Sequence, residues 1–525
     1  MAESAAPAHA RAVESFDAWE GRCVARRASA TPSEVEDAIA RARGGNPAWK
    51  AASAEQRARV LLRFAALVFD HRESVAGLIA TEVGKPIGEA LASEVTVVLD
   101  DARRCARRAP VLLRPRRHWS RNPALWRKRL VVERVPLGVV GVIAPWNYPF
   151  MLAAGHILPA LAMGNTVVFK PSEYTPLSGE RLVALLHEAG VPTDALVLVH
   201  GDGRTGDALV RGGVDFVCFT GSAAAGAQVA RRCGERMIPC SLELGGADAA
   251  LVLDDAPIEH AARGLTWGRF MNAGQSCVAP KRVFVTPGAY APLVDALQRE
   301  IGKLRQGSPT SGAVDLGGLI RATQADHVRR QRDETIAAGA AVRAESTVQA
   351  SAPHVITPTL LTDAPDGTPA WTEEIFGPVL VVERVNSPDA AVARANMSPY
   401  GLSASVWSRD RARAVRVARR LEVGSVAIND VVSLVGVVEL PHGGVKRSGY
   451  GRLHGDESLL ECTRTLAIAD DALPTVANPW WFPYSRELTA DFVHFLGLPH
   501  GRTIGDRLRG VRSALRLVRR ALSSS

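Results

Sequence analysis

Short apolar runs that alternate with helical stretches organise the middle of the chain. Four such runs are rich in β-branched residues: VVGVIA, TVVFK, ALVLVH and DFVCFT, which begin at positions 139, 166, 195 and 215. Segments of helical periodicity lie among them and begin near Ser178, Thr205 and Ser222. This alternation predicts βαβ units and therefore a parallel, doubly wound sheet. A second α/β region extends from about Gly245 to Gly444.

The first hundred residues predict helices. Thr31 and Glu34 form a capping box at the start of one helix, and the glycine pair at 44–45 is expected to end it. Ser53 and Gln56 start a second helix, which continues with apolar residues at helical spacing. Residues 130–135 (LVVERV) predict an edge strand or a hairpin that reaches out from the sheet.

One stretch has the composition of a membrane span, because residues 136–169 contain no Asp, Glu, Lys or Arg. A spanning helix needs about 20 helix-compatible apolar residues. Pro145, Pro149 and Pro159 interrupt this stretch, so a buried strand, loop and helix fit better. We predict no transmembrane segment, and the N-terminus lacks the apolar region of a signal peptide.

Cysteine content and charge narrow the class of protein further. The chain of 525 residues has seven cysteines and no CxxC pair, which argues against disulfides or a zinc site and favours a cytoplasmic protein without a metal. The net charge of +9 is concentrated in residues 101–134 and 502–520, and the remainder is acidic. Because no basic-aromatic binding motif accompanies this charge, we expect no nucleic-acid partner.

Two glycine motifs are candidates for a phosphate-binding turn. Residues 201–206 match GxGxxG but lack the acidic residue expected about 20 positions further on, so we interpret them as a glycine-rich connection. In FTGSAAAG, a strand ends at Thr220, Gly221 permits a tight turn, and Ser222 can cap the next helix. The helix N-terminus suits a pyrophosphate, although an ordinary capped helix explains this motif equally well.

Lys170 and Glu173 follow the strand TVVF, at the edge of the sheet where open α/β folds bind ligands. They are suited to hold the hydroxyls of a ribose, and a solvated ion pair is the simpler alternative. Because a carboxylate there would repel a 2′-phosphate, Glu173 favours NAD over NADP.

Three residues are candidates for chemistry. Cys277 lies in GQSCVAP, but a lone cysteine more often packs in a core, and no histidine is near it in sequence. Glu243 lies in LELGG, where apolar neighbours would raise its pKa towards that of a useful base, unless backbone amides satisfy it. Asn147, between two prolines in PWNYP, is a rigidly mounted donor or simply part of a turn.

Seven segments in this order resemble the aldehyde dehydrogenase superfamily, and the likeness extends from about residue 30 to residue 466. The segments are PWNYP, GNTVVFKPSEYTP, FTGSAAAG, LELGG, GQSC, EEIFGPV and PHGGVKRSGYGR. The resemblance implies a Rossmann-like, doubly wound cofactor domain, a second α/β catalytic domain and a small β oligomerisation element. These would comprise residues 1–116 and 137–243, residues 244–445, and residues 117–136 and 446–470, followed by a C-terminal extension at 471–525.

The resemblance also implies a role for each matching residue. Cys277 would attack the aldehyde to form a thiohemiacetal, Asn147 would help to form the oxyanion hole, and Glu243 would activate the water that hydrolyses the thioester. The remaining matches imply contacts with NAD, or with NADP as the second possibility. These residues are Trp146, Lys170, Ser172, Glu173, Gly221, Ser222, Glu374 and Phe376.

The chain departs from the family pattern at Ala247, where many members have Lys, and at His442, where many have Phe. Neither position is catalytic, but His442 would lie near the substrate entrance unless it is an ordinary packed histidine. The loop at 429–440 resembles the substrate-anchoring loop and carries no Arg or Lys. A dicarboxylic semialdehyde would need a cation there, so we expect an uncharged aliphatic or aromatic aldehyde.

Two regions of the chain are candidates for contacts with partners, and two alternative functions remain open. Residues 130–135 and 463–468 match the strands that family members use to form homodimers or homotetramers. The tail ends in a basic amphipathic helix that suits either a neighbouring subunit, which we favour, or peripheral contact with an anionic membrane. Two other functions remain: a CoA-acylating aldehyde dehydrogenase, which would not need Glu243, and a non-catalytic binding protein that retains the fold.

Overall fold

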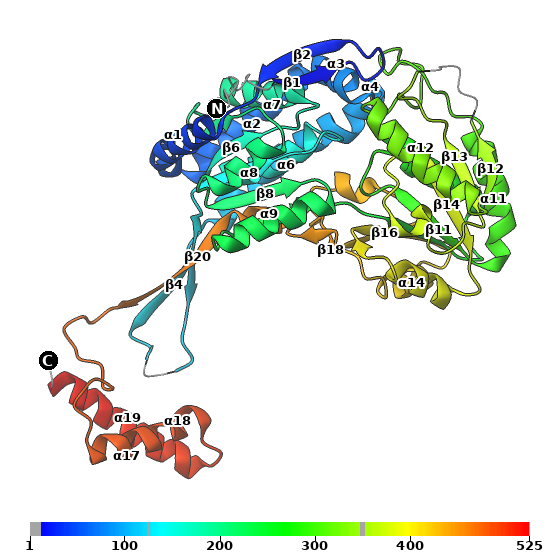
Figure 1. The fold of residues 1–525 in the computed structure, drawn as a ribbon. Helices are drawn as coiled ribbons and strands as arrows, with labels where there is room; N and C mark the ends of the chain where they lie inside the picture. The colour runs from blue at the N-terminus through cyan, green and yellow to red at the C-terminus, as the bar shows by residue number, and fades with distance from the viewer. Residues whose placement is uncertain (1–11, 123–124, 347–351, 524–525) are drawn as a thin grey trace, which may run out of the picture. The chain divides into compact units, whose positions relative to one another are not determined.

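The computed structural model describes residues 12–122, 125–346 and 352–523, and the chain divides into two compact units. The first unit contains the residues up to 111 together with 136–463, and the second contains 112–135 together with 464–525. The first unit carries two large sheets flanked by helices, and the second combines a small sheet with packed helices (Figure 1). The predicted boundaries between the cofactor and catalytic domains stay a prediction.

The N-terminal region is helical, as predicted, after a hairpin of β1 (Ala12–Phe16) and β2 (Cys23–Ala28). Its helices are α1 (Pro32–Ala51), α2 (Ala54–Asp70), α3 (Arg72–Val83), α4 (Ile87–Ala90), a π-helical turn at Leu91–Val95 and α5 (Thr96–Leu112). Both predicted capping boxes are present, at Thr31 with Glu34 and at Ser53 with Gln56.

The expected end of the first helix at Gly44 and Gly45 is wrong, because α1 continues to Ala51. Tertiary packing explains the difference. A Cβ atom at Gly45 would lie 2.7 Å from the side chain of Asp194, so the glycine permits a close approach. Beyond it, the buried Trp49 donates a hydrogen bond from Nε1 to the carbonyl of Leu161 at 3.1 Å. These contacts hold the last turns of the helix in place.

The first large sheet has six strands in the order β19-β9-β8-β5-β6-β7. Only β19 is antiparallel to its neighbour. The strands are β5 (Val139–Ile143), β6 (Thr166–Lys170), β7 (Leu196–Leu198), β8 (Phe216–Thr220), β9 (Cys240–Glu243) and β19 (Gly449–Tyr450), connected by α6 (Met151–Ala162), α7 (Pro176–Glu188), α8 (Gly203–Arg211) and α9 (Ala223–Glu235).

The strand order of this sheet places a topological switch point between β5 and β8. From β5 the chain adds β6 and β7 on one side, and then returns to add β8 and β9 on the other. Open α/β sheets bind ligands at such a point, beyond the carboxyl ends of the strands. The segments that leave the sheet there begin at Ala144 and Gly221, so they carry Asn147 and Ser222.

The second large sheet has the order β12-β13-β14-β11-β10-β16-β17, and only β12 is antiparallel. Its strands are β10 (Asp248–Val252), β11 (Pro280–Val285), β12 (Ala341–Glu345), β13 (Thr359–Thr362), β14 (Val379–Arg384), β16 (Ser403–Trp407) and β17 (Ser425–Ile428). The helices of this region are α10 (Ile258–Phe270), the 3-10 turn η3 (Met271–Gly274), α11 (Pro287–Ile301), α12 (Ala322–Ala337), α13 (Pro369–Thr372), α14 (Pro388–Asn396) and α15 (Arg411–Ala418). The later helix α16 (Gly455–Glu461) instead contacts α6 of the first sheet. The predicted fold class, α/β with a doubly wound parallel sheet and a second α/β region, is confirmed.

The second unit contains β3 (Arg116–His118), β4 (Lys128–Pro136) and β20 (Thr463–Asp471), in the order β20-β4-β3. Arg127 and Lys128 both form ion pairs with Asp471, at 2.8 and 2.5 Å. After β20 the chain forms α17 (Arg486–Phe495), α18 (Gly497–His500) and α19 (Ile504–Ser523). Residues 130–135 and 463–468 are therefore strands, as predicted.

No helix within the described ranges combines the length and hydropathy needed to cross a bilayer. The stretch at 136–169 without charged residues contains β5, α6 and most of β6, all of them buried. This agrees with its interpretation as a strand, loop and helix of the protein core.

Candidate active site

Cys277 lies in the loop between η3 and β11, in a side-chain environment that is neither fully buried nor fully exposed. A tight turn precedes it, in which Gly274 has a φ of +76°. A Cβ atom at that position would lie 2.4 Å from the carbonyl group of Gly377, so only glycine fits. Burial raises the pKa of the Cys277 thiol to about 12, although the nearby Lys281 ammonium opposes the shift.

Asn147 is brought to the Cys277 loop by direct hydrogen bonds. Its Nδ2 donates to the carbonyl oxygen of Gln275 at 3.2 Å, two residues before the cysteine. Asn272 secures the same junction, because its Nδ2 donates to the carbonyls of Asn147 at 2.9 Å and Gln275 at 3.2 Å. An amide donor is therefore fixed beside the loop that carries the thiol, although the two are 130 positions apart in the sequence.

Glu243 ends β9 with its side chain buried, and burial raises the pKa of this carboxyl well above its usual range. Its Oε1 has no hydrogen-bond partner among the described residues. A Cβ atom at Gly443 would lie 2.7 Å from this oxygen, so the glycine leaves room for the carboxyl group. Backbone amides therefore do not satisfy this oxygen, unlike in the alternative of a strand-end acid with a purely structural role.

The backbone of Glu243 also contacts the candidate phosphate-binding turn. Its carbonyl accepts a hydrogen bond from the amide of Gly221 at 3.0 Å, in continuation of the β8–β9 pairing. Ser222 caps α9, since its hydroxyl accepts from the amide of Ala225 at 3.3 Å. The candidate base and the N-terminus of a 13-residue helix therefore lie at adjacent strand ends.

Lys170 and Glu173 lie at the carboxyl end of β6, as predicted. The buried Lys170 ammonium donates to the carbonyls of Pro171 and Gly201, each at 2.9 Å, and lies 3.9 Å from the Glu173 carboxylate. Burial lowers the pKa of Lys170. Gly201 belongs to the GxGxxG match, so that segment supports the lysine; its interpretation as a glycine-rich connection stays a prediction. The hydroxyl of Ser172 is used locally, because it accepts from the amide of Tyr174 at 3.3 Å.

Glu374 connects the segment after Glu243 with the strand that follows the cysteine loop, because it contacts both Gly246 and Lys281. Its Oε1 accepts from the amide of Gly246 at 3.2 Å and lies 3.4 Å from Lys281 Nζ. Burial raises the pKa of Glu374, and the Lys281 ammonium opposes that shift. Two residues further on, the ring of Phe376 meets that of Trp146 edge-on, with 5.6 Å between centroids.

Lys281 was missed by the sequence reasoning. Its ammonium donates to the carbonyls of both Ser276 and Cys277 at 2.8 Å, and it faces the Glu374 carboxylate. It therefore fixes the backbone of the cysteine loop and supplies positive charge near the thiol. The signal available in the sequence was a lysine at the start of a buried strand, four positions after the candidate nucleophile.

A second buried network, also missed, supports the Asn147 segment from behind. Lys85 and Glu94 form an ion pair of 2.7 Å with both side chains fully buried. Glu94 Oε2 accepts from the amides of Phe150 and Met151, at 2.9 and 3.2 Å, in the turn after Asn147. Both charged residues come from the N-terminal helical region and have no motif that marks them.

The cysteine loop is supported in the same way by an acid from the N-terminal region. Glu89 Oε2 accepts from the amide of Asn272 at 2.9 Å. The Lys85 ammonium also lies 3.5 Å from the centre of the Tyr148 ring, which adds a cation–π contact to the Asn147 segment. The π-helical turn after α4 thus belongs to the supporting shell of the site.

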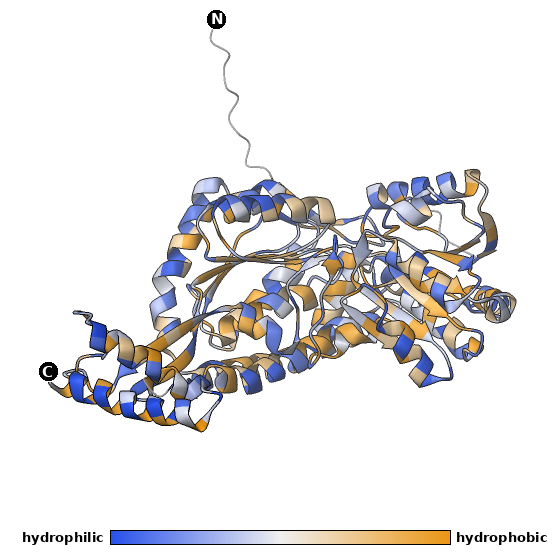
Figure 2. Ribbon diagram, turned by 90° about the horizontal axis from the view of Figure 1, so that it is seen from below, coloured by the Kyte–Doolittle hydropathy of each residue, from blue (hydrophilic) through white to orange (hydrophobic). Residues whose placement is uncertain are grey.

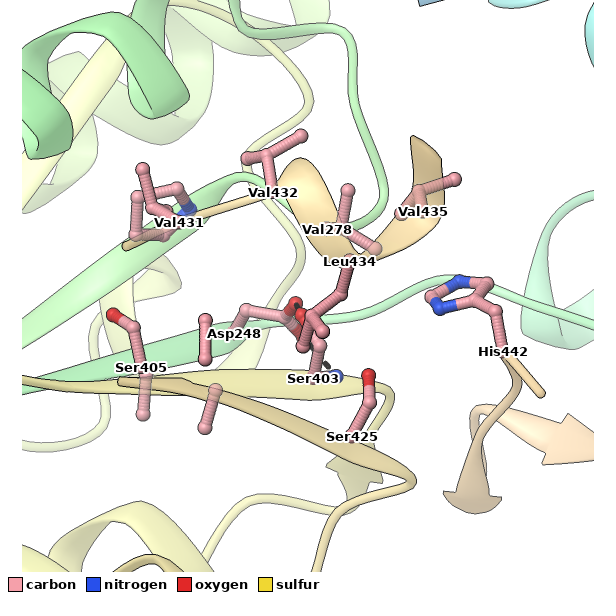
Figure 3. Close-up of a pocket in the computed structure, with 14 residues that line it drawn as sticks. Asp248, Val278, Ser403, Ser405, Ser425, Val431, Val432, Leu434, Val435 and His442 are labelled. Carbon is pink, nitrogen blue, oxygen red and sulfur yellow. Dashed lines mark hydrogen bonds between the residues drawn. The ribbon is translucent and has the colours of Figure 1, made fainter. Parts of the chain in front are cut away.

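A pocket lies directly beside the cysteine loop, in the region of the predicted substrate-anchoring loop. Figure 3 shows Val278, which follows Cys277, together with Leu434, Val435 and His442 in its wall. None of the residues that line it is Lys or Arg. The acid present is Asp248, which accepts from the hydroxyl of Ser403 and whose pKa burial raises to about 7.

His442 lies in the wall of this pocket with its side chain buried, which agrees with the alternative of a packed histidine; its position near the substrate entrance stays a prediction. Burial lowers the pKa of His442 to about 3, so its imidazole is neutral at physiological pH. Its backbone pairs with that of Leu453 in both directions, at 2.8 and 2.7 Å. The histidine is therefore held by the strand-like pairing of PHGG and contributes a neutral, polar ring to an otherwise mainly apolar wall.

The residues at the switch point fit a nicotinamide dinucleotide. The N-terminus of α9 offers amides to a pyrophosphate, and Gly221 lets the backbone pass close to the Phe219 ring, where a Cβ atom would lie 2.6 Å away. Lys170 and Glu173 offer a donor and an acceptor at the neighbouring strand end. The Cys277 thiol lies on a loop that is joined to the Asn147 amide next to such a sheet edge, which suits an oxidoreductase that acts on carbonyl compounds.

Comparison with known proteins assigns the chain to such a class. Residues 5–468 match the model of the aldehyde dehydrogenase family, and the chain belongs to this family. It is an oxidoreductase, and the predicted NAD(P)-dependent oxidation of an aldehyde is confirmed at that level. The NAD(P) cofactor is likewise confirmed, whereas the preference for NAD stays a prediction.

Three similar proteins illustrate the range of the family. A 4,4'-diapolycopene aldehyde oxidase of Methylomonas sp is 35% identical over 487 residues, which cover 92% of this chain and 90% of that protein. A Mycolicibacterium smegmatis protein provisionally named succinate-semialdehyde dehydrogenase, NADP(+), is 34% identical over 86% of this chain and 87% of its own length. The crystal structure of NADP-dependent glyceraldehyde-3-phosphate dehydrogenase from Bacillus halodurans, complexed with NADP, aligns with a TM-score of 0.83 and 35% identity over 88% of this chain and 96% of that one.

Proposed function

We propose that the chain oxidises an uncharged aldehyde to its carboxylic acid through covalent intermediates on Cys277. The Cys277 thiol first loses its proton to solvent. The thiolate then bonds to the carbonyl carbon while the C=O π electrons move to oxygen, and the resulting alkoxide is stabilised by the side-chain amide of Asn147 and the backbone amide of Cys277. Bound NAD(P) supplies the hydride acceptor. Oxidation at the former carbonyl carbon leaves a thioester, and water attacks it to release the acid and the thiol.

Within this proposal Glu243 removes a proton from the attacking water. The supporting observation is its buried carboxyl, which has an oxygen without a partner in the described chain and a raised pKa. Such a carboxyl holds a proton more readily than an exposed one, as a general base requires. A CoA-acylating enzyme has a thiol acceptor and needs no such base, so Glu243 favours hydrolysis.

The single observation that carries the proposal is the attachment of Asn147 to the Cys277 loop through Gln275. The test compares Cys277→Ala, Asn147→Ala and Glu243→Gln with Cys23→Ala, which removes a thiol outside the site. We expect Cys277→Ala to lose NAD(P)H formation from hexanal and Asn147→Ala to be strongly slowed. Glu243→Gln should be limited to a single turnover, and Cys23→Ala should be unchanged. Normal steady-state turnover by Cys277→Ala, or strict dependence on added CoA, would refute the mechanism.

The proposed substrate is an uncharged aliphatic or aromatic aldehyde. The pocket beside Cys277 has no cation among its lining residues, and Asp248 would repel a second carboxylate. The Methylomonas relative, an aldehyde oxidase for 4,4'-diapolycopene by its name, is compatible with an apolar substrate. A turnover panel tests this: succinic semialdehyde outperforming hexanal and benzaldehyde by a wide margin would defeat the assignment.

We further propose a cytoplasmic homodimer or homotetramer. For its C-terminal tail we now prefer peripheral contact with a membrane over packing on a neighbouring subunit, because the exposed face of α19 is apolar and is flanked by arginines. The exposed edges of the β20-β4-β3 sheet support assembly by strand pairing. The cofactor domain would comprise residues 1–116 and 137–243, which hold NAD through the turn at Gly221 and through Lys170 and Glu173. A molar mass measured by light scattering that corresponds to a single chain would refute the oligomer.

A further inference from the structure

The helices α17 and α19 of the second unit pack against each other along one face of α19. The buried residues of that face are Gly510, Ser513, Leu517 and Ala521, spaced by three or four positions. Gly510 allows the chain to pass closely, because a Cβ atom there would lie 2.5 Å from the amide nitrogen of Leu498. An ion pair between Arg516 and Asp491 joins the same two helices. The packing of α19 within its own unit is therefore already provided by this face.

A different face of α19 carries large apolar side chains that nothing in the described chain covers. This apolar stripe consists of Ile504, Leu508, Val511, Leu515, Val518 and Leu522. Its members are between 44% and 79% exposed and recur at alternating intervals of four and three, so they align along one side of the helix. Figure 2 shows hydrophobic and hydrophilic positions alternating along the helix next to the C-terminus. A contiguous exposed surface of this kind marks an interaction site.

Positive charge and aromatic rings accompany the apolar stripe. Arg512 and Arg519 lie next to it in the helix and form no ion pair within the described ranges. Arg520 donates to the carbonyl of Pro483 at 2.6 Å, which ties the preceding aromatic segment to the end of α19. In that segment Trp481, Phe482 and Tyr484 are exposed. Apolar, aromatic and basic groups in one small unit are the components of an interfacial membrane-binding helix.

We propose that the apolar stripe of α19 lies on an anionic phospholipid bilayer, with Arg512 and Arg519 at the lipid phosphates. The stripe would enter the boundary between headgroups and acyl chains without crossing it, since no described helix could span a membrane. The positive charge beside the stripe favours an anionic bilayer over a second copy of the chain as the partner of this face. A second α19 laid against the first would bring arginines near arginines, whereas anionic lipid neutralises them. This inference rests on the proposed function, because it names the surface at which the enzyme would meet apolar aldehydes.

The experiment is co-sedimentation of the full chain with vesicles of phosphatidylcholine alone or mixed with phosphatidylglycerol. We expect the wild type to pellet with the mixed vesicles and to remain largely in solution with phosphatidylcholine. The double variant Leu508→Asn with Leu515→Asn should bind these vesicles at least about tenfold more weakly, because two exposed leucines that would enter the bilayer are lost. Arg512→Gln with Arg519→Gln keeps the stripe and should also weaken binding to the mixed vesicles at least about tenfold, because two attractions to anionic lipid are lost.

Matched controls separate the possible failures. Leu62→Asn with Val415→Asn removes two exposed apolar side chains of the first unit and should pellet like the wild type. Hexanal oxidation should be unchanged in all three double variants; an inactive wild type would refute the proposed function, whatever its vesicle binding. Wild type that stays in solution with both kinds of vesicle would overturn the membrane surface. A stripe variant that changes the molar mass in solution but not vesicle binding would assign the stripe to a contact between copies.

Discussion

Replacing Asn147 by alanine should slow aldehyde oxidation by two to three orders of magnitude while leaving the fold intact. The Asn147 amide has two N–H groups, and one of them donates to the carbonyl of Gln275. In the proposed mechanism the other donates to the alkoxide formed on Cys277. Removal of one preorganised donor of this kind typically costs about 3–4 kcal/mol of barrier, or about 10²- to 10³-fold in kcat.

The structural cost of this substitution should be much smaller. The Gln275 carbonyl keeps a second donor, Asn272 Nδ2 at 3.2 Å, and the backbone carbonyl of residue 147 keeps its bond from Asn272. One neutral hydrogen bond is lost, worth about 1 kcal/mol. The rate effect can therefore be separated from unfolding.

The assay is NAD(P)H formation from hexanal under saturating conditions, combined with the thermal midpoint of each variant. Asn147→Asp serves as the matched variant, because it keeps the shape of the side chain but removes its N–H donors. It should be slowed at least as much as the alanine variant. If Asn147→Ala retained more than a tenth of the wild-type kcat with a normal thermal midpoint, the amide would not stabilise the alkoxide.

Three further outcomes are expected. Glu243→Gln should form one equivalent of NAD(P)H per active site and then stall, and a rapid-mixing experiment without such a burst would contradict its role in hydrolysis. Because the thiolate is the reactive form and burial raises the pKa of Cys277 to about 12, inactivation by iodoacetamide without cofactor should accelerate about tenfold per pH unit between about pH 7 and 9; a flat profile would show a lower pKa. Lys85→Met should destabilise the fold by about 3–5 kcal/mol in denaturant unfolding, because it leaves the Glu94 carboxylate buried and unpaired. Lys85→Met combined with Glu94→Leu should recover most of that loss, and equal instability of the single and double variants would argue against this cause.

Local signals in the chain predicted the elements that carry the site. The β-branched runs form β5, β6, β7 and β8. A strand in a parallel sheet is buried on both faces, so a short continuous apolar run between turns is typical of one. The capping boxes at Thr31 and Ser53 worked because their hydrogen bonds are made within four residues. The prediction that the glycine pair ends α1 was wrong because contacts with distant residues decide the outcome there. The close approach to Asp194 and the hydrogen bond to Leu161 outweigh the local cost of glycine in a helix.

Of the candidate site, the residues within motifs could be named in advance, but not the groups that hold them. Lys281 was missed because its role depends on the fold of the loop at 274–277, where its ammonium meets two carbonyls. Lys85 and Glu94 pair with each other, but they were missed because the segment they support, around Tyr148 and Phe150, lies more than 50 positions away. Contacts between distant segments leave no periodicity in the sequence.

The sequence by itself therefore determined the alternation of strands and helices, the caps, and the residue types available for chemistry, since these depend on interactions along a few neighbouring residues. Only the tertiary structure decided that Asn147 reaches the Cys277 loop and that Glu243 keeps an unpartnered oxygen. It also decided which face of α19 is packed and which is exposed, although both faces contain apolar residues. The physical reason is that burial and hydrogen bonding between distant segments depend on which surfaces meet in space, and those energies exceed any local preference.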